Sequence, residues 1–427
     1  MVADSFGNEI DSVTGFAPGR LIHNSADINL RARWAQEIIR KRKKKGEGIY
    51  NFIGVNTSFP IETADLEMAT DELVGASFYV DRLRKMAIEH LGGDPVGHEV
   101  LFCNRLSAGN VATVLSFVKE GDILLSYIAP PRGFTHSSIR YGTKLAGAAF
   151  VEVVSPEEVE KILEEQGQRI SLVMVTGTNT ALTSPTTEQL ERVVKTAKAR
   201  NKIVYIDDAS GARLRPVLYG QPRSLELGVD LAGTSGEKLL PGPRSGWIAG
   251  NKELVEKVNN TLTMIGGEMR PPVRVSLLRG LERYDSESIV KMKEHGEKIY
   301  HSAKRLYGDR AEGIFGGIHI RYDDSLSIVL DKLGGKEAEI VPVEASVGAG
   351  VCLLEDFGIM TVAGVWDASG TFSLRLKPIA EEGERFGSPE QIVRALDRSY
   401  DRVADNASDV DNMGRLLFGK FYKHGES

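Results

Sequence analysis

The sequence has few cysteines, only 2 among 427 residues. Cys103 and Cys352 cannot build a disulfide framework, and such low usage suits a reducing compartment. No apolar run approaches the roughly 20 residues that a transmembrane helix needs, and the first residues lack the basic-then-apolar pattern of a secretory signal. No cluster of Cys and His has metal-ligand spacing. We therefore expect a soluble cytoplasmic protein without a metal site or a membrane partner.

The chain also lacks an excess of positive charge. Its formal net charge is −6 at pH 7, which argues against a broad nucleic-acid-binding surface. One basic run, Arg40–Lys45, ends an expected helix that begins near Ser25 and stops at Gly46. Cations are favoured at a helix C-terminus, so a solvated helix end is the simplest interpretation, and contact with RNA or another polyanion is the alternative.

Apolar segments alternate with amphipathic helical patterns from about residue 100 onward. This alternation predicts an α/β fold with a mostly parallel sheet that helices cover on both faces. A first helix is expected over Asn110–Lys119, and the helix near Thr186 has capping-box spacing with Gln189. The expected strands are Glu99–Cys103, Ile123–Ser126, Ala149–Val153, Ser171–Thr176, Ile203–Ile206 and Gly246–Ala249.

Three regions follow from the change of pattern along the chain. Residues 1–50 are expected to form an N-terminal extension and helix, residues 51–290 the large domain, and residues 291–427 a small C-terminal α+β domain. In this last region, short strands are expected at 317–321, 327–330 and 371–376.

The most informative motif is Ser235-Gly236-Glu237-Lys238, which a glycine- and proline-rich loop follows. It looks like the lysine loop of an enzyme that uses pyridoxal 5'-phosphate (PLP), in which the lysine amine holds the cofactor aldehyde as a Schiff base. A lysine near glycines is often just a solvated loop residue. An apolar strand that ends in Asp207-Asp208-Ala209, with Asp207 lying 31 residues before Lys238, adds the second element of a PLP site.

The acidic pair after this strand has one member suited to the cofactor. A buried carboxylate keeps the pyridine nitrogen of PLP protonated, which makes the ring a better electron sink. We assign that role to Asp207, because it leaves the strand first. Side chains alternate across a strand, so Asp208 is expected on the opposite face, where it caps the next turn.

A PLP site also needs an anion cradle for the phosphate. Ser107, Ala108 and Gly109 lie between an expected strand and an expected helix, where small residues expose backbone N–H groups and the helix dipole attracts an anion. Ser235 adds a hydroxyl, and Arg244 is a candidate ligand for the phosphate or the substrate. A plain helix N-cap is the alternative for the first three residues.

Two further residues complete the expected site. His136 follows the strand Ile123–Ser126 and has a ring that can stack on PLP and transfer protons. Arg375, in the small domain, is the candidate for binding the carboxylate of an amino-acid substrate; an exposed arginine on an edge strand is the alternative. The loop Gly266–Pro272 is a further candidate segment, for which contribution by a partner subunit is one option.

With these motifs in view, the chain resembles the selenocysteine-synthase-like branch of fold-type I PLP enzymes, in particular its archaeal members. The resemblance covers about residues 50–410 and is sharpest around Asn104–Ser107, His136–Ile139, Asp207–Arg213 and Leu227–Gly246. It implies a seven-stranded aminotransferase-like large domain, a homodimer or higher oligomer with shared active sites, and Lys238 as the Schiff-base lysine.

The expected function is that of a PLP-dependent lyase or transferase of amino acid metabolism. It would act on a small amino acid by deprotonation at Cα, followed by β-elimination or β-replacement. An enzyme acting on an aminoacyl-tRNA is a second hypothesis, although the sequence shows only the short basic run Arg40–Lys45 where the resemblance implies an extended basic N-terminal domain. A PLP-binding protein without turnover is a third, and transamination and racemisation are lesser options.

Overall fold

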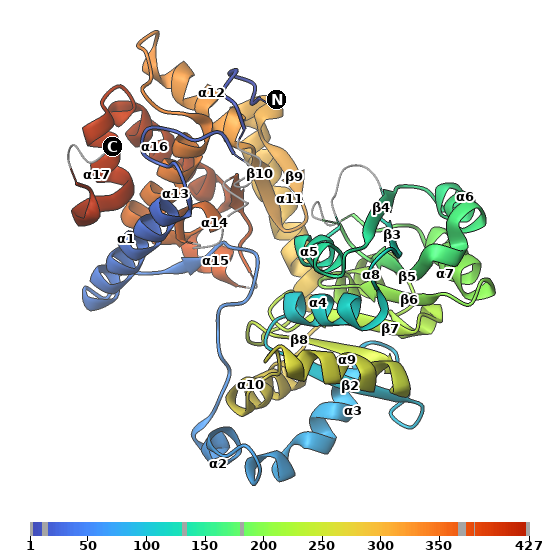
Figure 1. Ribbon diagram of the computed structural model, residues 1–427. Helices are drawn as coiled ribbons and strands as arrows, with labels where there is room; N and C mark the ends of the chain where they lie inside the picture. The colour runs from blue at the N-terminus through green and yellow to red at the C-terminus, as the bar shows by residue number, and fades with distance from the viewer. Residues whose placement is uncertain are drawn as a thin grey trace. The chain divides into compact units, whose positions relative to one another are not determined.

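The computed structural model describes residues 3–10, 16–129, 135–179, 183–365, 373–379 and 381–423. The chain forms two compact units (Figure 1). One comprises Val55–Val290, and the other joins Met1–Gly54 to Lys291–Ser427. No helix in the described part of the chain is long and apolar enough to cross a membrane.

A seven-stranded sheet organises the unit Val55–Val290. The strand order is β2-β8-β7-β6-β5-β3-β4. Only β8 runs antiparallel to its neighbours, so the sheet is mostly parallel, as expected. The strands in this order are β2 (His98–Cys103), β8 (Gly246–Asn251), β7 (Leu231–Ser235), β6 (Ile203–Asp207), β5 (Ile170–Thr176), β3 (Ile123–Tyr127) and β4 (Ala149–Val153).

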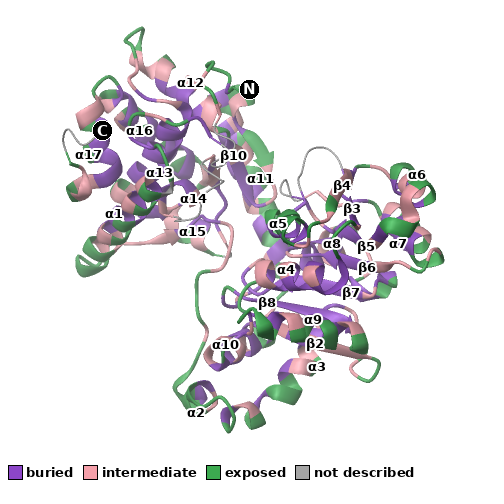
Figure 2. Cartoon of the chain, viewed as in Figure 1, coloured by how far each residue is buried: buried purple, intermediate pink, exposed green. Residues whose placement is uncertain are grey.

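Helices bury both faces of this sheet, which explains why its central strands are apolar along their whole length. One face carries α4 (Leu106–Phe117), α5 (Ser137–Leu145) and α9 (Lys252–Met264). The other carries α3 (Val80–His90), α6 (Pro156–Gln166), α7 (Thr187–Ala199) and α10 (Pro271–Glu282), and α8 (Gly211–Tyr219) adds Ala212 to the same core. A short helix, α2 (Leu66–Thr70), packs on α10. Figure 2 shows the central strands as buried.

The second unit surrounds a buried helix, α13 (Pro342–Phe357). Its small sheets are β1 (Tyr50–Asn51) with β11 (Ile359–Met360), and β12 (Leu374–Leu376) with β10 (Gly317–Ile320) and β9 (Glu312–Ile314). Its other helices are α1 (Ser25–Lys44), α11 (Glu287–Tyr307), α12 (Tyr322–Leu333), α14 (Val362–Val365), α15 (Glu382–Phe386), α16 (Pro389–Asn406) and α17 (Val410–Phe418).

Three sequence-based expectations differ from the structure. Residues 1–50 are not a separate extension, because Ile28, Trp34 and Ile38 of α1 belong to the same apolar core as α13. The segment 327–330 lies inside α12 rather than in a strand. The helix expected from Asn110 begins four residues earlier, at Leu106. In the expected strand 371–376, Thr371 and Phe372 lie outside the described residues.

Candidate active site

One pocket of the sheet unit brings most of the expected PLP-site residues together. β6 and β7 are parallel neighbours, and Asp207 pairs with Gly233, so the ends of both strands open at the same edge of the sheet. Asp207 ends β6, and Lys238 follows β7 by three residues. The pocket is lined by Arg105, Leu106, Ser107, Asn110, His136, Asp207, Ala209, Ser235, Glu237 and Lys238.

Asp207 is buried at this pocket, and only one of its two carboxylate oxygens accepts a hydrogen bond from the described residues. Its Oδ2 accepts a hydrogen bond from Asn110 Nδ2 at 2.9 Å. Asn110 is itself held by Tyr205, whose hydroxyl donates to Asn110 Oδ1 at 2.5 Å. Asp207 Oδ1 is buried without a hydrogen-bond partner among the described residues. A buried carboxylate oxygen with no donor is costly, and a ligand N–H in the pocket would satisfy it.

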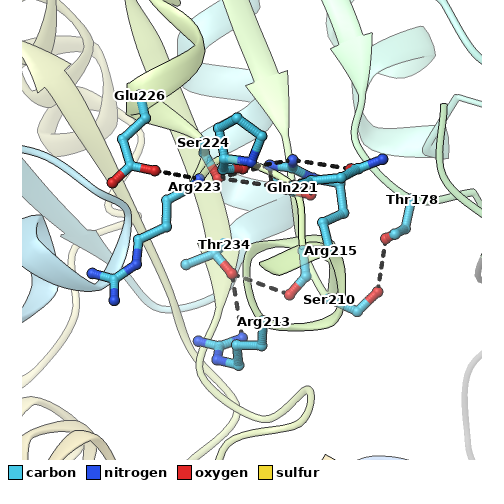
Figure 3. A network of polar contacts seen from close by, with 12 residues as sticks. Thr178, Ser210, Arg213, Arg215, Gln221, Arg223, Ser224, Glu226 and Thr234 are labelled. Atoms are coloured by element: carbon cyan, nitrogen blue, oxygen red, sulfur yellow. Dashed lines mark hydrogen bonds and ion pairs between the residues drawn. The ribbon is translucent and has the colours of Figure 1, made fainter. Parts of the chain in front are cut away.

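Asp208 points away from this pocket, as the alternation of side chains predicts. It forms a fully buried ion pair with Arg215, with 2.5 Å between Oδ2 and Nη2. Ser224 Oγ donates to the same oxygen at 2.7 Å. Figure 3 shows Arg215 and Ser224 within this network of polar contacts. Asp208 therefore stabilises the fold, and of the two adjacent carboxylates only that of Asp207 faces the pocket.

The loop that carries Lys238 is held by backbone contacts. Gly236 N donates to Ser245 O at 3.0 Å, which closes the loop at its base. Asn56 N donates to Glu237 O at 2.8 Å, and Asn56 Nδ2 donates to Gly242 O at 2.7 Å. A residue distant in sequence thus links both sides of the loop. No motif in the sequence around Asn56 marks it as a residue of the site.

The start of α4 forms another wall of the pocket. A Cβ atom on Gly246 would lie 2.5 Å from Leu106 N, so only glycine lets the helix start approach β8 this closely. Ser107 lines the pocket. Ala108 and Gly109 do not, and their N–H groups bond to Arg105 O at 2.9 and 3.3 Å. The anion cradle expected at Ser107, Ala108 and Gly109 therefore stays a prediction, of which only Ser107 lines the pocket.

His136 is the N-cap of α5 and reaches the mouth of the pocket. Its Nδ1 accepts from Ser138 N at 3.2 Å and lies 2.6 Å from Ser138 Oγ. An accepting Nδ1 leaves the proton of the neutral ring on Nε2. The pocket walls desolvate the ring and lower the pKa of His136, although the negative charge of Asp207 acts in the opposite direction.

The two candidate arginines are not among the residues that line this pocket. Arg244 lies exposed in the loop before β8. Arg375 belongs to the other unit, where it lies on β12 directly opposite His319 of β10, and burial lowers the pKa of its guanidinium. Both assignments stay predictions. Among the described residues, no group of His, Cys, Asp and Glu is arranged to hold a metal ion.

Comparison with known proteins identifies the family. A UPF0425 pyridoxal phosphate-dependent protein of Methanothermobacter thermautotrophicus is 31% identical over 397 residues, which is 92% of this chain and 98% of that protein. The chain belongs to this family of PLP-dependent proteins. A member from Methanosphaera stadtmanae is 29% identical over 87% of the chain and 94% of its own length.

Selenium transferases are more distant relatives of this PLP-dependent protein. The family model described as SelA, L-seryl-tRNA selenium transferase, matches residues 166–265. The L-seryl-tRNA(Sec) selenium transferase of Aquifex aeolicus is 28% identical over 51% of the chain and 52% of its own length. Serine palmitoyltransferase of Sphingomonas wittichii has the same fold, with a TM-score of 0.55 at 14% identity over 88% of this chain and 84% of that one.

The pocket residues fit PLP. The buried Asp207 Oδ1, to which no described residue donates a hydrogen bond, matches the N–H of a protonated pyridine ring. Lys238, which lines the pocket, would supply an amine for the aldehyde, and the helix start with Ser107 would supply polar groups for a phosphate. These features and the family relationship make the chain a PLP-dependent enzyme of fold type I, among the transferases and lyases.

Proposed function

We propose that this enzyme is a lyase or transferase that acts on a small amino acid. Lys238 would hold the cofactor and would accept the Cα proton of the substrate, so that a β-substituent could be eliminated or replaced. The observation that carries the proposal is Asp207 Oδ1, which has no hydrogen-bond partner in the described part of the chain and lies in the pocket that Lys238 also lines.

Each pocket residue has a defined task in this proposal. Bound PLP supplies an electron sink for the bond that breaks at Cα. Asp207 holds the proton on the ring nitrogen, and its contact with Asn110 fixes the orientation of the carboxylate. His136 covers the ring and moves protons through Nε2. Ser107 and Ser235 bind the phosphate. The first turn of α4, which includes Ala108 and Gly109, adds the attraction of the helix dipole.

Arg375 is proposed to bind the substrate carboxylate. Arg375 is half-buried, and burial lowers the pKa of its guanidinium. Across the sheet, His319 Nδ1 lies 2.9 Å from Glu312 Oε2, while His319 Nε2 is buried without a partner among the described residues. Since Nδ1 donates to the Glu312 carboxylate, Nε2 of the neutral His319 ring is an acceptor, and the Arg375 guanidinium is the group that offers donors to a carboxylate. Arg244 is the second candidate for a substrate or phosphate contact.

An aminoacyl-tRNA substrate is the second candidate function, favoured by the similarity to selenium transferases over residues 166–265. The basic end of α1 is the candidate tRNA contact. Two of its cations already serve the fold: Arg42 Nη1 donates to Glu355 O at 2.7 Å, and Lys41 lies over the Trp34 ring. The four others, Arg40, Lys43, Lys44 and Lys45, should give salt-sensitive tRNA binding if this function is correct.

The decisive experiment traps the cofactor on its lysine. Protein incubated with PLP is reduced with borohydride, and the peptide that carries the reduced PLP is identified by mass spectrometry. Lys238 should be labelled, and Lys238→Ala should lose both the label and turnover, whereas Lys252→Ala, an exposed control at the start of α9, should keep both. A label on another lysine would refute the assignment.

The same preparations separate the remaining functions. A panel of amino acids is screened for ammonia and 2-oxo acid, which report elimination, and for replacement products when thiols are added. Binding of tRNA is measured at low salt with and without neutralisation of residues 43–45. A cofactor spectrum that no amino acid changes would support the non-catalytic alternative. Sedimentation of the PLP-bound protein tests the proposed homodimer or higher oligomer.

A further inference from the structure

Arg213 is a fully buried cation that contacts the lysine loop from behind. It lies in α8 and is 1% exposed. Its Nη1 donates to Lys238 O at 2.8 Å and to Thr234 Oγ1 at 3.3 Å. Figure 3 shows Arg213 directed at Thr234. The Thr234 hydroxyl in turn donates to Ala209 O at 3.1 Å, so this contact joins the segment after Asp207 to the strand that leads to Lys238.

The carbonyl group of Lys238, to which Arg213 donates, lies in a strained turn. It belongs to the peptide group between Lys238 and Leu239, and Leu239 has a φ of 55°. Residues with a Cβ avoid this left-handed region. A hydrogen bond to Lys238 O fixes ψ of Lys238 and φ of Leu239 together. Arg213 therefore sets the direction in which the Lys238 side chain leaves the backbone.

The fold gains little else from burying this cation. Arg213 Nε and Nη2 have no partner among the described residues, and burial lowers the pKa of Arg213 to about 10. The Trp247 ring, whose centre lies 5.3 Å from Cζ, and the nearby charges of Glu237 and Asp208 offset part of this cost. Unpaired buried charges destabilise proteins. A residue retained at such a cost fits a role at the active site better than a role in packing.

We propose that Arg213 is the positioning residue of Lys238. It keeps the left-handed turn in place, so that the lysine amine faces the pocket that it shares with Asp207. The inference rests on the proposed role of Lys238, and it assigns the orientation of that lysine to one hydrogen bond from α8.

The test compares Arg213→Met, which keeps the volume and removes the donors, with Arg213→Lys, which keeps a charge. Arg223→Met serves as the control, because Arg223 is exposed and lies outside the pocket. The measurements are the dissociation constant of PLP, the fraction of bound PLP that borohydride traps on Lys238, and the melting temperature without PLP. Arg213→Met should weaken PLP binding about tenfold or more, as expected for one charge-assisted hydrogen bond. Arg213→Lys should fall between it and the wild type.

A second substitution distinguishes positioning from packing. Leu239→Gly removes the penalty for a positive φ, so in the Arg213→Met background it should restore part of the PLP affinity and of the trapping on Lys238. Unchanged PLP binding in Arg213→Met and Arg213→Lys would overturn the inference, as would a loss that Leu239→Gly does not reduce. Labelling of a different lysine in the wild type would instead refute the proposed function, and this inference with it.

Discussion

Asp207 and Asp208 are adjacent carboxylates that the structure uses in opposite ways, and the same substitution should separate them. Asp208→Asn breaks a fully buried ion pair with Arg215. Asp207→Asn breaks no ion pair, because Asn110 is the donor to Asp207 Oδ2 and Oδ1 has no partner among the described residues. The first substitution should therefore damage the fold, and the second the cofactor site.

The magnitudes follow from burial. Removing one member of a buried pair leaves an uncompensated charge, which costs about 3–5 kcal/mol, so Asp208→Asn should destabilise the protein with or without PLP. Asp207→Asn should change the stability of the PLP-free protein by less than about 1 kcal/mol, because the amide remains able to bond Asn110. It should lower PLP affinity by roughly 10- to 150-fold, since it removes a charge-assisted hydrogen bond worth about 1.5–3 kcal/mol.

Thermal unfolding with and without PLP, together with PLP titration by absorbance, measures both effects. The expected pattern is a low melting temperature for Asp208→Asn in both states. For Asp207→Asn we expect a normal melting temperature without PLP and a reduced increase on adding PLP. Wild-type PLP affinity in Asp207→Asn would refute the assignment of the ring-nitrogen contact. An equal loss of stability in the two PLP-free variants would refute the argument from burial.

Three other predictions concern buried groups. Burial holds the pKa of His90 well below its usual value, so His90 stays neutral in the folded protein. As the pH decreases below about 6.5, the unfolded chain binds a proton there, and the free energy of unfolding should decrease by up to ~1.4 kcal/mol per pH unit. His90→Gln should reduce this slope in denaturant titrations. Burial raises the pKa of Cys103 to about 12 and also raises that of Cys352, so iodoacetamide at pH 8 should alkylate both only after denaturation. Gly246→Ala should push Leu106 away, lowering the melting temperature and weakening PLP binding; unchanged values would show that α4 can shift freely.

Local motifs predicted much of the site. Two short patterns are visible in the sequence: a strand that ends in an acidic pair, and a loop with Ser-x-x-Lys. Because the chemistry of PLP requires both a carboxylate and an amine, Asp207 and Lys238 could be proposed together. The opposite direction of Asp208 followed from the period of two along a strand. The mostly parallel sheet followed from apolar strands that alternate with amphipathic helices.

Contacts between distant segments could not be predicted in this way. Asn110 was placed at an expected helix start, yet its role depends on Tyr205 and Asp207, almost 100 residues away. The apolar run at 327–330 fits a strand or a buried helix turn equally well, because a short run carries no clear period. The amphipathic pattern of α1 revealed a buried face but not which core would bury it.

The order of the strands explains why a site built from such separate pieces can be rigid. β6 and β7 are hydrogen-bonded neighbours, and α8 lies between them in the chain, so the crossover that makes them parallel also returns Arg213 to the end of β7. The carboxylate at the end of β6 and the amine after β7 are thus fixed by one strand–helix–strand unit rather than by two independent loops. Parallel sheets bind ligands at the carboxyl ends of their strands, and here the connecting helix itself supplies the contact that orients the lysine.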